Sequence, residues 1–189
     1  MCVMDAAVKE AAVARFLREH PQMERAAWDH PALLGCADVG WSQIPGCPAG
    51  IPVLLRGLLD EAAGTEALPV LENVLMNSVF HVSAVMPAAL PFLIRLAAVP
   101  DIAVRPGLVG LLVVAAELSL PVDADDERQV LLFGKDCDHP ERDGCRAAFA
   151  AHASALRALL DDETLPEGLI SADDRECLLK AVEPQRSPS

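Results

Sequence analysis

Apolar residues recur along this chain at intervals of three and four positions, the spacing that places them on one face of an α-helix. No segment alternates with the period of two that marks a half-buried β-strand. Glycine and proline divide the apolar pattern into segments of helical length. The pattern therefore predicts an all-α fold, with helices within residues 5–18, 21–29, 51–63, 65–80, 81–99, 103–118, 126–134, 145–160 and 171–182.

The predicted helix boundaries depend on stop and cap residues. Gly64 is expected to end the helix over 51–63, and Thr65 to cap the next one. Ser171 offers an N-cap for the last helix. Glycine and proline crowd residues 30–50, which predicts a loop, and carboxylates crowd residues 135–144, which predicts an acidic loop between helices.

One apolar segment nearly repeats itself. Ile51-Pro52-Val53-Leu54-Leu55-Arg56 is echoed by Leu90-Pro91-Phe92-Leu93-Ile94-Arg95, at an offset of 39 residues. Each copy belongs to an apolar helix with proline near its start, and a second apolar helix follows each. Helix pairs that recur at about 40 residues are typical of an α-solenoid.

The helix-pair period and the Leu, Val and Ala filling resemble the HEAT and armadillo-like repeats. The segment from Trp41 to Leu118 is similar to a repeat unit of actinobacterial HEAT-type proteins, through Trp41, the Ile51-Pro52 start and His81 ahead of Pro87. The resemblance implies a short right-handed α-solenoid of about three HEAT-like helix pairs with capping helices. One such domain is expected over residues 1–183, and residues 184–189 are expected to form a disordered tail, as chain ends commonly do. Such folds serve mainly protein binding, inhibition and scaffolding, and less often catalysis.

Charge narrows the class of partner. The chain has 28 acidic and 15 basic residues, a net charge of −13, with the basic residues scattered singly. Such a surface repels phosphate backbones, so nucleic acid is not expected as a partner. The acidity is interpreted either as a means of staying soluble or as an acidic face that steers a basic protein partner.

No apolar stretch is long enough for a membrane span and no secretory segment opens the chain, so we expect a cytoplasmic protein whose six cysteines are reduced.

Polar residues interrupt the apolar helix predicted over 65–80. Asn73 and Asn77, four positions apart, would face one direction on a helix. Because the second helix of a solenoid unit commonly lines the concave face, the predicted binding residues are Trp41, Arg56, Glu72, Asn73, Asn77 and His81. The alternative is ordinary hydrogen bonding between adjacent helices and, for Trp41, a loop anchored to the core.

The densest cluster of chemically reactive residue types lies in residues 136–145. Cys137, His139 and Cys145 could supply three ligands to zinc, with an aspartate as the fourth. The alternative is a solvated acidic loop in which Cys145 is a small buried residue of the next helix. Paired Cys-x-x-Cys ligands, which would be the strong signal, are absent.

The sequence has no recognisable catalytic motif: Gly-x-Ser-x-Gly, Gly-x-Gly-x-x-Gly, the phosphate-binding Gly-Lys-Ser/Thr and His-Glu-x-x-His are all missing. The favoured function is a protein-binding module, most concretely an immunity-type inhibitor that masks a basic partner protein. The alternative is an enzyme or a metal-dependent small-molecule-binding protein that uses His81, His139 and the loop of Cys137 and Cys145. Whether the protein catalyses a reaction is left open, and no cofactor is expected unless residues 136–145 bind zinc.

Overall fold

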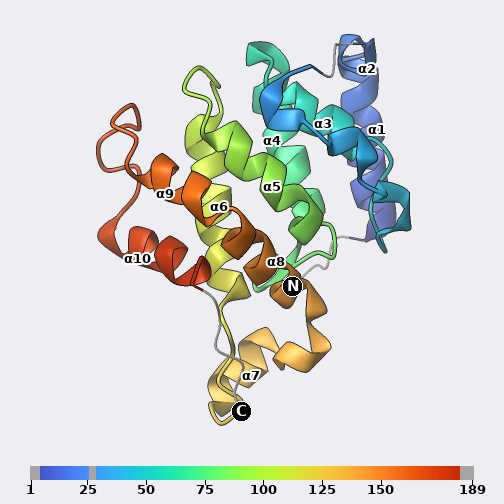
Figure 1. Ribbon diagram of the computed structural model, residues 1–189. Helices are drawn as coiled ribbons and strands as arrows, with labels where there is room; N and C mark the ends of the chain where they lie inside the picture. The colour runs from blue at the N-terminus through green and yellow to red at the C-terminus, as the bar shows by residue number, and fades with distance from the viewer. Residues whose placement is uncertain (1–4, 26–28, 184–189) are drawn as a thin grey trace.

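The chain folds predominantly as α-helices, as its apolar pattern predicts (Figure 1). The computed structural model describes residues 5–25 and 29–183, so the predicted tail over 184–189 lies outside the described residues. The α-helices are α1 (Ala6–Glu19), α2 (Gln22–Arg25), α3 (Ile51–Gly57), α4 (Glu61–Leu75), α5 (Met86–Ala97), α6 (Arg105–Ser119), α7 (Glu127–Phe133), α8 (Pro140–Ala151), α9 (Ala153–Leu160) and α10 (Ala172–Ala181).

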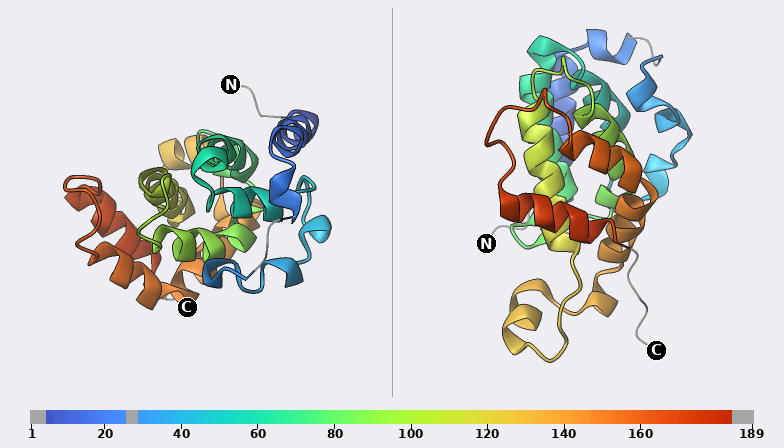
Figure 2. Two further views of the ribbon diagram at one scale, coloured as in Figure 1. Left: turned by 90° about the horizontal axis from the view of Figure 1, so that it is seen from above. Right: turned by 60° about the vertical axis from the view of Figure 1, so that its left-hand side comes forward.

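The helices of the main body lie in two layers (Figure 2, left). In one layer α1 packs on α4, α4 on α6, and α6 on α10; in the other, α5 packs on α8 and α9. Consecutive helices α3 and α4 form an antiparallel pair across the layers, and so do α5 and α6. Leu, Val and Ala side chains fill the space between the layers, so α5 and α6 are buried along most of their length.

Residues 121–139, named the arm here, project away from this body (Figure 2, right). The arm contains α7 and the short 3₁₀ helix η4 (Asp136–Asp138). Unlike the helices of the two layers, α7 contains no buried residue. The arm joins the body where its last residues lead into α8.

Cationic side chains from neighbouring elements cap the C-terminal ends of the helices. The last carbonyls of a helix lack partners within it and carry its negative dipole end, so a positive donor there is favourable. Seven of the chain's 15 lysines and arginines donate a hydrogen bond to a backbone carbonyl at the end of a described helix. The pairs are Lys9 with Val74, Arg56 with Met23, Arg95 with Leu34, Arg105 with Ala97, Arg142 with Phe133, Arg146 with Ser119 and Arg175 with Leu160.

Carboxylates and a hydroxyl cap several N-terminal ends. Asp5, Asp60 and Asp126 accept backbone N–H groups of the first turns of α1, α4 and α7. Ser171 and Asp174 form a reciprocal capping box on α10, which confirms the predicted cap at Ser171. These acidic caps lie near the surface, whereas Lys9, Arg56, Arg105 and Arg142 are buried.

The predicted boundary at Gly64 and Thr65 is wrong. α3 already ends at Gly57, and Gly64 and Thr65 lie inside α4. The Asp60 carboxylate accepts hydrogen bonds from Ala62 N (3.0 Å) and Ala63 N (2.8 Å), so the helix starts there. Thr65 instead donates its hydroxyl to the Ala62 carbonyl, one turn back within the helix.

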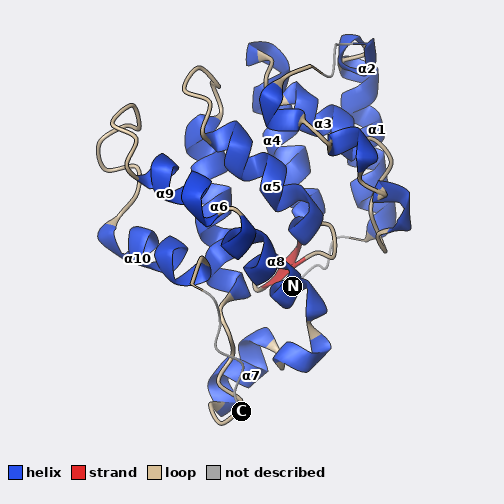
Figure 3. Cartoon of the chain, viewed as in Figure 1, coloured by secondary structure: helices blue, strands red, loops and turns tan. Residues whose placement is uncertain are grey.

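The expectation that no strand forms is also wrong at one place. Strands β1 (Met76–Ser78) and β2 (His81–Val82) form a short antiparallel hairpin directly after α4 (Figure 3). α4 therefore ends at Leu75, five residues before the predicted end. The Asn77 side chain holds the hairpin closed, because its Nδ2 donates to the Val82 carbonyl (3.4 Å). A side chain that bonds the returning backbone competes with helix continuation.

Two further segments differ from their predicted form. The helix expected over 145–160 divides at His152, whose backbone (φ −110°, ψ 19°) leaves the helical region, and the two parts, α8 and α9, both pack on α5. The predicted loop over 30–50 contains three 3₁₀ turns, η1 (Pro31–Leu33), η2 (Cys36–Asp38) and η3 (Trp41–Gln43). Their apolar residues Ala32, Leu33 and Cys36 are buried, which explains why this segment forms ordered turns.

Within the described residues, no helix is long and apolar enough to cross a membrane.

The capping scheme predicts the cost of removing Lys9. Its ammonium is buried and donates to Val74 O (3.1 Å) and Asn77 Oδ1 (2.9 Å). Lys9→Met keeps the apolar stem and leaves both oxygens without this donor, so we expect the free energy of unfolding to fall by about 2 kcal/mol. Urea denaturation measures the change. The matched control Lys180→Met, at an exposed lysine, should stay within about 0.5 kcal/mol; equal losses in the two variants would contradict the capping role.

Candidate functional site

The predicted binding residues do not form one surface. Arg56 is buried, with 3% of its surface exposed, and it donates to the Met23 carbonyl. Burial lowers the pKa of its guanidinium, with Cys36 acting in the opposite sense. Arg56 therefore points into the fold and holds α2, which gives the prediction that it faces a ligand no support.

Trp41 anchors the segment 30–50 to the body. Its indole Nε1 donates to the Cys36 carbonyl (2.9 Å), and its ring lies 6.0 Å from that of Phe92 on α5. The residue is 8% exposed and lines one wall of a cavity of about 470 Å³ together with Pro48 and Pro52. These contacts agree with the alternative in which Trp41 anchors a loop to the core, and the side chain also borders the cavity.

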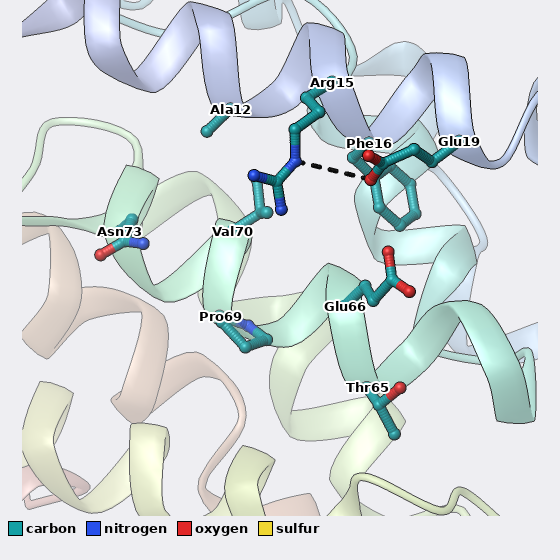
Figure 4. A pocket seen from close by; sticks show the side chains of 9 residues that line it. All are labelled: Ala12, Arg15, Phe16, Glu19, Thr65, Glu66, Pro69, Val70 and Asn73. Carbon is teal, nitrogen blue, oxygen red and sulfur yellow. Dashed lines mark ion pairs between the residues drawn. The ribbon is translucent and has the colours of Figure 1, made fainter.

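Asn73 lines a groove between α1 and α4 (Figure 4). The groove has a volume of about 380 Å³ and its floor includes Phe16 and Val70. Arg15 and Glu19 form an ion pair on the α1 side (Nε to Oε2, 3.5 Å), and Glu66 lies on the α4 side. The groove is therefore amphipathic, with a charged rim around an apolar floor.

Asn77 does not share a helical face with Asn73, since α4 ends before it. Its amide oxygen accepts from buried Lys9, which ties α1 to the hairpin. This contact agrees with the alternative prediction for Asn77, in which its side chain hydrogen-bonds to a neighbouring helix. Glu72 is half-buried on α4, and burial raises the pKa of its carboxyl.

Two predicted residues from separate parts of the chain do meet. The imidazoles of His81 on β2 and His139 at the start of α8 stack with their ring centroids 4.7 Å apart and their planes 34° apart. Ser78 Oγ lies 2.8 Å from His81 Nδ1, and Glu141 Oε1 lies 2.8 Å from His139 Nδ1. Ser78, His81, His139 and Glu141 are named the histidine cluster.

The histidine cluster joins the hairpin to the base of the arm. His81 also hydrogen-bonds to the backbone of Phe133, whose carbonyl accepts from Arg142. The Phe133 ring meets Phe80 edge-on, with centroids 5.6 Å apart. Arg142 in turn pairs with Asp136 on η4 (Nη1 to Oδ1, 3.0 Å). The cluster is thus the joint at which the arm is held to the body.

The electrostatics of the joint favour neutral His81. Burial lowers the pKa of His81 from its usual 6.5, and His139 and Arg142 lower it further, while the Phe133 backbone and Glu141 act in the opposite sense. With the His139 ring in contact and Arg142 nearby, protonating His81 is unfavourable. Each ring nevertheless has a hydrogen-bond partner, so the arrangement is well suited to hold the arm in place.

The predicted zinc ligands do not gather. Cys137 is exposed on η4, whereas Cys145 is completely buried within α8. Burial raises the pKa of Cys145 to about 12, which disfavours the thiolate that zinc requires. Across residues 5–25 and 29–183, no group of three or more His, Cys, Asp or Glu side chains is arranged to hold a metal ion. The structure therefore gives the zinc prediction for Cys137, His139 and Cys145 no support.

Sequence reasoning missed three residues of the joint: Ser78, Glu141 and Arg142. Ser78 precedes His81 by three positions, a spacing that a hairpin turn brings together, but the apolar pattern predicts a helix there. Glu141 lies in the segment for which the sequence predicts an acidic loop. Arg142 gave no local signal, because its partners Phe133 and Asp136 become neighbours only when the arm folds back on α8.

Comparisons of the chain with protein-family models, with curated proteins and with solved structures each found no match. The geometry of the described residues is therefore the basis for the function proposed below.

The histidine cluster predicts a pH-dependent stability. Below the usual histidine pKa of 6.5 the unfolded chain takes up a proton that folded His81 resists, so the free energy of unfolding should fall as the pH is lowered through this range. His81→Gln should show a smaller loss between about pH 7.5 and about pH 5.5 in urea titrations. Part of the loss should persist, since burial also lowers the pKa of His152.

Ser78→Ala is the matched control for this pH prediction. It removes the hydroxyl from His81 Nδ1 but keeps both imidazoles, so it should lower stability by about 1 kcal/mol at every pH and retain the full pH dependence. An unchanged pH dependence in His81→Gln would contradict the role assigned to His81.

Thiol labelling separates burial from metal binding. Exposed Cys137 should react with iodoacetamide in the folded protein, while buried Cys36 and Cys145, with pKa values raised to about 11 and about 12, should react only on unfolding. A chelator should leave this pattern unchanged. Protection of Cys137 that a chelator removes, with about one zinc per chain, would restore the zinc-site interpretation.

Proposed function

We propose that this protein is a protein-binding module that docks on a basic partner protein. One observation carries the proposal: seven of the chain's 15 cationic side chains bond helix C-terminal carbonyls within the fold, while acidic residues remain outside as N-caps and loop carboxylates. Four of the seven cations, Arg105, Arg142, Arg146 and Arg175, also pair with aspartates, and the excess of acidic over basic residues leaves the exterior acidic. An acidic exterior steers cationic partners and repels phosphate backbones.

The proposal includes the arrangement of the helices as a short HEAT-like α-solenoid. The contacts that support it are the pairs α3–α4 and α5–α6, stacked through α4 and α6. The repeated arginines support it as well. Arg56 and Arg95, at matching positions of the two copies, each donate to a backbone carbonyl earlier in the chain, at Met23 and Leu34. A stacked array presents an extended preformed surface, which suits protein recognition.

Within this class, the most concrete proposal is an immunity-type inhibitor located in the cytoplasm. A small acidic protein is suited to cover a basic active site that acts on nucleic acid or nucleotides, because the two surfaces have complementary charge. Rigid helices and internally bonded cations favour this role, since little ordering is needed on binding.

The alternative of an enzyme at the histidine cluster has weaker support. A Ser–His pair at 2.8 Å and a carboxylate at 2.8 Å from the second imidazole are groups that acid–base chemistry uses. Here Ser78 also accepts from Phe80 N, and His81 bonds the Phe133 backbone. These contacts hold the arm in place, which favours a structural role for the cluster.

Purification of the tagged chain from the cells that make it tests the proposal. We expect one stoichiometric basic protein, which is then expressed separately and titrated with this chain. The affinity should fall at least tenfold between about 0.05 M and about 0.5 M salt, and the chain should suppress the partner's activity at a 1:1 ratio. Recovery of a stoichiometric acidic protein or of a nucleic acid would contradict the proposal. If the basic protein binds but keeps its activity, the chain is a scaffold and the inhibitor role is wrong.

A further inference from the structure

One apolar residue of α7, Leu131, is exposed on the arm, whereas Phe133 at the end of the helix packs edge-on against Phe80. The helix ends in Val130-Leu131-Leu132-Phe133, and none of its residues is buried. Leu131 is 84% exposed, more than the other large apolar side chains that the described residues leave in solvent. A seven-residue helix is marginal in water without tertiary burial. An apolar helix that projects from the body therefore marks an interaction surface.

The arm is nevertheless held in a defined position. Asp126 caps α7 through its Oδ1, which accepts from Arg128 N (2.9 Å) and Gln129 N (3.1 Å). At the other end, Arg142 and His81 bond the Phe133 backbone, and Asp136 pairs with Arg142. Contacts at both ends fix the orientation of α7. A preorganised recognition element loses less conformational entropy on binding than a free peptide.

Charge on the arm selects the occupant. Residues 121–139 carry six carboxylates and two basic side chains, and Asp125, Glu127 and Asp138 are exposed. A second copy of this chain, with a net charge of −13, would be repelled, and so would nucleic acid. A cationic protein surface with an apolar pocket would attract the carboxylates and would bury the exposed leucine.

We infer that the arm is the docking element of this protein, and that Leu131 of α7 enters an apolar pocket on the partner that lysine and arginine side chains surround. The inference rests on the proposed function and names the surface that carries it. The flanking carboxylates steer the encounter, and the leucine supplies the buried contact at its centre.

A defined probe tests this inference: a fluorescein-labelled helical peptide of lysine and leucine, titrated with the full chain and followed by anisotropy. Leu131→Ser, at an exposed position, should weaken binding about tenfold. Glu127→Lys should weaken it and reduce its salt dependence. The matched controls are Leu34→Ser, at another exposed leucine, and Glu163→Lys, at another exposed carboxylate, and both should bind the probe within about twofold of the wild type.

The outcomes separate the inference from the function beneath it. If the probe binds and the control variants weaken it as much as the arm variants do, docking on a cationic partner stands and the arm is excluded as its site. If the probe does not bind even at low salt, docking on a cationic partner fails, and the inference fails with it. Light scattering adds a third outcome: dimers that Leu131→Ser abolishes would make a second copy the occupant and overturn the inference.

Discussion

Bonding between buried cationic side chains and helix C-terminal carbonyls is the constraint on which this structure depends. A helix end that lies inside a protein must find donors for its last carbonyls. Here the donors come from other elements: Lys9 of α1 serves α4, Arg105 of α6 serves α5, and Arg146 of α8 serves α6. Each bond satisfies a polar group and also fixes one helix against another.

The same bonds shape the exterior. Lys9, Arg56, Arg105 and Arg142 are buried, while the carboxylates that cap helix N-termini stay near solvent. Stability and surface charge are therefore coupled. A fold built in this way presents an acidic surface, which is the physical basis for proposing a basic partner protein.

The arm shows how the capping scheme extends to a projecting element. Arg142 is 1% exposed, and it bonds both the end of α7 and Asp136, so a buried cation of the body holds a helix that has no buried residue of its own. The stacked imidazoles of His81 and His139 lie at the same joint. The position of the arm thus depends on charged and titratable groups together with one aromatic contact, between Phe133 and Phe80, whereas the two-layer body is held mainly by apolar burial.

The sequence by itself determined the helical class, most helix positions and the cap at Ser171, because these features depend on residues close together in the chain. It also singled out His81 and His139. Tertiary structure alone decided that these two rings stack, that Lys9 meets Val74 and Asn77, and that Arg56 points inward. Such contacts join residues far apart in the chain. Local periodicity and cap signals carry no information about which distant carbonyl a cation reaches, so only the folded packing could settle them.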